Sequence, residues 1–111
     1  MSTNEFPRSV IFNYASSVDY SDGAIVSKTV IKKESGNISV FAFDKGEGLS
    51  EHTAPFDAMI TVVDGTGEVI IGGKSFILTA GESIIMPANI SHAVNAIERF
   101  KMMLTMIKET A

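Results

Sequence analysis

The sequence predicts an all-β sandwich or barrel. Short apolar stretches rich in β-branched residues recur at intervals of roughly 8–12 residues, which is typical of such folds. Strong turn signals separate these stretches, among them Asp64-Gly65-Thr66-Gly67 and Gly72-Gly73. No stretch has a convincing helical period of apolar residues. With 111 residues, the chain is long enough for one hydrophobic core and one domain.

The expected elements follow one another with short connections. Residues 1–8 are expected to form a flexible arm, in which Pro7 disfavours a helix. Residues 9–109 are expected to form the single domain. The strand after Pro55 is expected to stop at the turn signal of Asp64–Gly67, and Gly72-Gly73 to form a two-residue hairpin turn. The expected strands cover residues 9–15, 24–32, 38–44, 57–63, 68–71, 75–78, 83–86, 92–97 and 100–108.

Composition and charge narrow the classes of partner. The formal net charge is -4 and no block of like charges occurs, which argues against nucleic acid or an anionic membrane as a partner. The chain has no cysteine, so disulfides and thiolate metal sites are excluded. No apolar run is long enough to span a bilayer, and the N-terminus lacks the pattern of a signal peptide. We therefore expect a cytoplasmic protein.

Strand alternation predicts which side chains face inward, because successive side chains of a strand point to opposite faces. The predicted inward set is apolar and includes the two histidines of the chain. An apolar cavity with a few polar groups is the usual form of a small-molecule site. We expect the following residues to line it: His52, Ala54, Ala58, Ile60, His92, Met102 and Met106.

Several strands are apolar on both faces, for example at Met59-Ile60 and Val62-Val63. A two-layer sandwich buries only one face of each layer, so the other face is expected to meet a second copy of the chain. The alternative is a monomer with scattered surface hydrophobic residues, which are common. We expect a homodimer.

Two stretches resemble the two sequence motifs of the cupin superfamily. Their spacing is carried by Gly46, His52 and Gly65 in the first stretch and by Gly81, Pro87 and His92 in the second. The resemblance covers residues 38–106. Within the superfamily, the chain resembles a small single-domain cupin of the cupin 2 or RmlC-like kind. It implies a double-stranded β-helix, that is, a jelly-roll barrel.

The chain departs from the family's motifs at four positions. Ala54 stands at the position of the second histidine, and Ala58, or Met59 with the longer spacing, at that of the glutamate. Asn89 replaces a glycine and Ala96 an asparagine. The resemblance implies a metal site of three histidines and one glutamate, of which this chain keeps at most two ligands.

These observations predict a protein that binds a small molecule in an apolar barrel pocket, with at most a weak metal site formed by His52 and His92. The ion would be Zn, Ni, Fe or Mn, with Asp57 as a further ligand if the loop at Pro55 turns it inward. Three alternatives stay open: a metal-dependent cupin enzyme of the dioxygenase or isomerase type, a histidine acting as general base, and two hydrogen-bonded, metal-free imidazoles.

Overall fold

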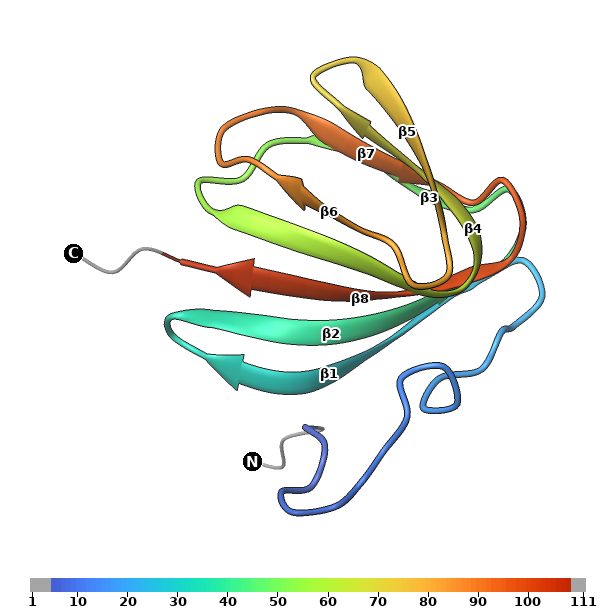
Figure 1. Cartoon of the computed structure of the whole chain (residues 1–111), viewed down its shortest axis with the longest axis vertical. Helices are drawn as coiled ribbons and strands as arrows, with labels where there is room; N and C mark the ends of the chain where they lie inside the picture. Colours follow the sequence, from blue (N-terminus) through green and yellow to red (C-terminus); the bar gives the residue numbers. More distant parts are fainter. Residues whose placement is uncertain (1–4, 109–111) are drawn as a thin grey trace.

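The computed structural model describes residues 5–108, of which residues 25–107 contain an antiparallel sheet of eight strands (Figure 1). The strands are β1 (Ile25–Lys33), β2 (Gly36–Phe43), β3 (Gly48–His52), β4 (Asp57–Ile71), β5 (Lys74–Thr79), β6 (Ser83–Met86), β7 (His92–Asn95) and β8 (Phe100–Ile107). The predicted all-β jelly-roll barrel is confirmed. Within residues 5–108, no helix is long and apolar enough to cross a membrane.

The strands form two layers that face each other (Figure 1). Layer A contains β1, β2, β8, the first part of β4, and β6. Layer B contains β3, β7, the second part of β4, and β5. Figure 1 shows β4 curving from one layer into the other, so this strand closes the barrel at one corner.

The prediction of two strands separated by a turn at Asp64–Gly67 was wrong, because β4 runs through this segment without interruption. The segment is a corner instead of a turn. A register shift falls between Val62 and Asp64, and Gly65 adopts a φ of 77°. Bulges and glycines allow a strand to bend from one sheet into another, which explains why turn chemistry appears inside a strand.

The main core lies between the two layers. Ala58, Ile60 and Val62 of β4 are buried, as are Phe100 and Met102 of β8, so the predicted inward parity of these strands is confirmed. The rings of Phe43 and Phe100 stack at 4.7 Å near the β4 corner. The barrel is therefore closed by large apolar side chains at this end.

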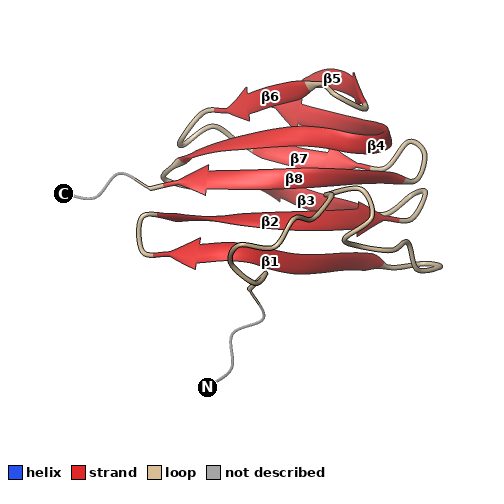
Figure 2. Ribbon diagram, turned by 60° about the horizontal axis from the view of Figure 1, so that its bottom comes forward, coloured by secondary structure: helices blue, strands red, loops and turns tan. Residues whose placement is uncertain are grey.

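The predicted strand over residues 9–15 was wrong. Residues 5–20 instead follow an irregular path across the outer face of β1 and β2 (Figure 2). Phe6, Tyr14, Val18 and Tyr20 pack there in a second apolar cluster, whereas Ile11 is 100% exposed. The anchoring residues are irregularly spaced, which suits a loop better than a strand. Residues 1–4 of the expected arm lie outside the described residues; within 5–8, Phe6 donates a backbone hydrogen bond of 3.0 Å to β1.

Charged side chains gather at the corner end of the barrel. Arg99 donates hydrogen bonds to Asp44 (2.7 Å) and Asp22 (2.6 Å). The Arg99 guanidinium and the Gly23 amide lower the pKa of Asp44 to about 2. Partial burial, together with the hydrogen bond that its hydroxyl donates to Asp64, raises the pKa of Tyr20. These contacts join the segment before β1 to the end of β2, the start of β8 and the corner of β4.

Candidate functional site at the mouth of the barrel

The two histidines meet at the other end of the barrel. His52 ends β3, His92 begins β7, and their Cα atoms are register partners. Their Nε2 atoms lie 3.1 Å apart, and the rings meet edge to face with centroids 4.3 Å apart. His92 is only 7% exposed, whereas His52 is exposed to solvent. The pair therefore lies where the interior opens to solvent.

The backbone sets the tautomer of both rings. His52 Nδ1 lies 2.8 Å from the carbonyl oxygen of Ser50, and His92 Nδ1 lies 3.2 Å from that of Ile90. A carbonyl oxygen only accepts hydrogen bonds, so each Nδ1 carries the proton. In the neutral rings each Nε2 is then an acceptor, and the two acceptors point at each other. The 3.1 Å separation favours either one proton shared by the two Nε2 atoms or a third group beside both that donates a hydrogen bond or carries positive charge.

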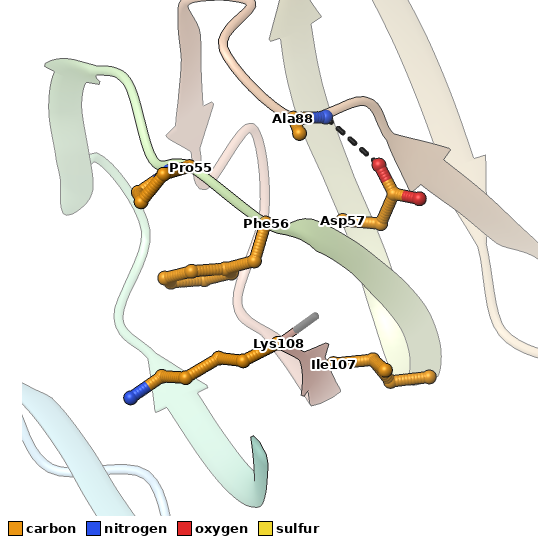
Figure 3. A pocket seen from close by; sticks show the side chains of 6 residues that line it. All are labelled: Pro55, Phe56, Asp57, Ala88, Ile107 and Lys108. Carbon is orange, nitrogen blue, oxygen red and sulfur yellow. Dashed lines mark hydrogen bonds between the residues drawn. The ribbon is translucent and has the colours of Figure 1, made fainter. Parts of the chain in front are cut away.

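Two loops form the rim beside the histidines. The loop after His52 and the loop before His92 are joined by a 2.7 Å backbone hydrogen bond from the Asn89 amide to the Ala54 carbonyl. Asp57 accepts a 2.9 Å hydrogen bond from the Ala88 amide, as Figure 3 shows. The Asp57 carboxylate is therefore used to hold the two loops together.

A hollow of about 430 Å³ lies at this rim (Figure 3). Its lining residues are Pro55, Phe56, Asp57, Ala88, Ile107 and Lys108. The Lys108 ammonium lies 5.9 Å from the centre of the Phe56 ring, a cation–π arrangement. The sequence prediction missed this hollow, because most of its walls come from loop residues whose side-chain directions strand alternation does not determine.

The other predicted lining residues lie at different depths. Ala58, Ile60 and Met102 belong to the buried core, and Met106 is packed against it. Ala58 is the register partner of both Met86 and Met106, so these three side chains form one row on the inner face of layer A. Ala54 lies in the rim loop and is half-buried. Their contact with a ligand stays a prediction.

Known proteins share this architecture. A family model described as a cupin domain matches residues 39–108. A conserved protein of unknown function from Streptococcus pyogenes is similar over 100% of this chain and 98% of its own, with 32% identity and a TM-score of 0.91. The chain belongs to the cupin family.

Two further solved structures are similar to this cupin. A cupin 2 conserved barrel domain protein from Leptotrichia buccalis is 47% identical over 87% of this chain, with a TM-score of 0.85; the alignment spans 47% of that longer protein. A cupin superfamily protein from Desulfitobacterium hafniense has a TM-score of 0.88 and 21% identity, over 98% of this chain and 100% of its own, and shows the shared fold alone. Among curated proteins, none matches the chain.

The donor set of this cupin does not fit a centre of three histidines and one glutamate. Within residues 5–108, no group of three or more His, Cys, Asp or Glu side chains is placed to hold a metal ion. Ala54 and Ala58 offer no ligand atoms, and Asp57 is bonded to the opposite loop. His52 and His92 are the two ligand-type side chains that the structure brings together.

One departure from the motif preserves the backbone of the rim. Asn89 replaces a glycine, yet it adopts a φ of 66°, in the left-handed region. Asparagine tolerates this region better than most residues other than glycine. The loop that positions His92 therefore keeps its shape despite the substitution.

Proposed function

We propose that this cupin binds a small molecule at the mouth of the barrel and that His52 and His92 orient it. The single observation that carries the proposal is the pair of facing Nε2 atoms, 3.1 Å apart, whose rings each use Nδ1 to bond a backbone carbonyl. The pair accepts hydrogen bonds from a ligand hydroxyl or ammonium group. Met106, the half-buried member of the row that it forms with Ala58 and Met86, provides apolar surface for the ligand's carbon atoms.

Thermal unfolding in the presence of small alcohols, amines, phenols and carboxylates tests this function. A ligand that binds only the folded state stabilises it by about 2.7 kcal/mol at a hundredfold excess over Kd. Hydroxyl and ammonium compounds should raise Tm, and His92→Ala should abolish the shift. Glu51→Ala is the control, since it changes an exposed neighbour of His52. If no compound of the panel shifts Tm, or if His92→Ala binds as well as the wild type, the proposal is wrong.

A divalent ion is the second candidate, favoured by the same spacing. With metal–nitrogen bonds of about 2.0–2.1 Å, two nitrogens 3.1 Å apart subtend an angle of about 98° at the ion. His52 and His92 alone would hold such an ion weakly, with water completing its coordination. Calorimetric titration with Zn, Ni, Fe and Mn tests this site. If His52→Ala and His92→Ala release the same heat of metal binding as the wild type, any bound metal lies elsewhere.

We also propose a homodimer formed through the outer face of layer A. Two rows of uncharged side chains cross this face. One row contains Thr105, Met59 and Ile85, and the other contains Met103, Thr61 and Ser83. Ile85 is 62% exposed, whereas the β1–β2 part of the face is packed against residues 5–20. A standard interface buries about 800 Å² per partner, roughly an eighth of the accessible area of 6549 Å².

Light scattering during size-exclusion chromatography tests the dimer. Ile85→Lys should convert it to monomers, because it places a charge in the uncharged rows. The matched control is Ile77→Lys on β5 in layer B, at a residue that is 54% exposed. A wild-type mass of one chain, or equal masses for both variants and the wild type, would contradict this interface.

A further inference from the structure

The inner face of layer A carries an asparagine, Asn37, whose side-chain oxygen has no hydrogen-bond partner in the described part of the chain. Asn37 of β2 is the register partner of Met106, which packs against the main core. Side chains of register partners in antiparallel strands lie on the same face. Asn37 therefore extends the apolar row of Met106, Ala58 and Met86, and the exposed Lys32 of β1 continues the row beyond Asn37.

The amide oxygen of Asn37 is buried and has no hydrogen-bond partner among residues 5–108. A buried polar atom without a partner destabilises the folded state, so such atoms are rare in native proteins. Valine or leucine would pack beside Met106 without this penalty. On a wall that also carries Met106, Ala58 and Met86, a buried acceptor without a partner is typical of a site at which a ligand supplies the missing donor.

Strand register places Asn37 and the imidazoles at the same end of the barrel. Gly36, at the start of β2, pairs with Ile107, which also pairs with Asp57 at the start of β4. The short loop before Asp57 begins at His52. Asn37 belongs to layer A and the histidine pair to layer B, so the two sets of acceptors lie on facing walls of the mouth.

We propose that Asn37 is a second anchor for the bound molecule and that the ligand carries a hydrogen-bond donor at each end of an apolar segment. This inference rests on the proposed binding function and specifies the chemistry of its ligand. One donor group bonds the His52 and His92 Nε2 atoms, and the other bonds Asn37 Oδ1. The apolar segment lies against Met106, which is half-buried. Diols and amino alcohols have this chemistry, whereas dicarboxylates present acceptors to acceptors.

Hexanediol, aminohexanol and adipate test the assignment, because they share a six-carbon chain and differ in their end groups. Hexanediol and aminohexanol should raise the Tm of the wild-type protein at neutral pH, and adipate should not. Calorimetry with aminohexanol then compares the wild type with Asn37→Leu, which keeps the size of the side chain and removes its acceptor. We expect affinity to fall by about tenfold or more, as for the loss of a hydrogen bond to a charged group.

The unliganded Asn37→Leu protein gives an independent readout. Removing an unpaired buried acceptor should raise its Tm by about 4 °C or more. Asn95→Leu is the matched control, because the Asn95 amide donates a 3.2 Å hydrogen bond to Glu68 on the exposed surface. This control should lower Tm and leave aminohexanol binding unchanged.

Three outcomes would overturn the inference. A lower Tm for unliganded Asn37→Leu would show that the amide is satisfied, for example by an ordered water. Equal aminohexanol affinity in Asn37→Leu and the wild type, with binding lost in His92→Ala, would remove Asn37 from the site and leave the proposed function standing. If neither hexanediol nor aminohexanol shifts the wild-type Tm, the assigned ligand chemistry falls, while a shift with another compound of the broader panel would preserve the binding function.

Discussion

Replacing Gly67 with alanine tests how the β4 corner is packed. A β-carbon added at Gly67 would lie 2.6–2.8 Å from three ring carbons of Phe100. That ring is fully buried and stacks on Phe43 with an interplanar angle of 3°, so it has little freedom to move. Overpacking of this kind costs about 1–3 kcal/mol.

At a strand position without such a contact, replacing glycine with alanine would stabilise the protein. Alanine is favoured over glycine by about 0.5–1 kcal/mol when the backbone suits both residues, and Gly67 does not have a positive φ. The steric term is larger, so we expect a net loss of about 1–2 kcal/mol. Tm should fall by about 4 °C or more, measured by circular dichroism.

A second substitution separates the clash from other effects. Phe100→Leu removes the ring edge that the new methyl group would meet. Gly67→Ala should therefore be less harmful in the Phe100→Leu background, with a coupling of about 0.5–3 kcal/mol in urea unfolding. A Gly67→Ala protein as stable as the wild type, or additive effects in the double variant, would refute this packing account.

Three further predictions concern the ends of the barrel. Asn89→Ala should destabilise the protein by about 1–2 kcal/mol in urea unfolding because its φ is 66°, while Asn89→Gly should not; equal effects would contradict a backbone cause. The pKa of Asp44, lowered to about 2, contributes stability above pH 4 that is lost as the pH falls towards 2, so Asp44→Asn should flatten the acid-unfolding profile over this range; an unchanged profile would count against the Arg99 contact. Tyr20→Phe removes the hydrogen bond to Asp64, and residues 5–20 should then be cleaved faster in limited proteolysis, whereas equal rates would show that the bond does not hold the segment.

Local patterns were sufficient to predict most of the strands. The run Ser83–Met86 forms β6 with the predicted bounds, and Gly72-Gly73 forms the predicted hairpin turn with φ values of 56° and 84°. Alternation of side chains also predicted which faces of β4 and β8 are buried. These features depend on neighbours along the chain, so the sequence contains the information needed to predict them.

Two predictions failed for a nonlocal reason. Asp64–Gly67 has the composition of a turn, but it bends a continuous strand around Phe100, which is far away in the sequence. Residues 9–15 are apolar enough for a strand, but they lie in an irregular segment that packs across β1 and β2. Composition alone does not distinguish these cases, because the deciding contacts are tertiary.

The candidate site, too, was predicted in part from the sequence and in part became known only from the tertiary structure. The spacing of Gly46, His52, Gly81 and His92 determined the family and identified the two histidines, since the spacing of residues along short strands limits where they lie in a jelly roll. Only the tertiary structure decided how the imidazoles interact, because Nδ1 of each ring meets a backbone carbonyl that brings the two Nε2 atoms within 3.1 Å. Only the register of β2 with β8 placed Asn37 on the facing wall, where its buried oxygen has no partner among the described residues. Sequence sets the chemical groups and their order, and the pairing of distant strands determines which of those groups face one another.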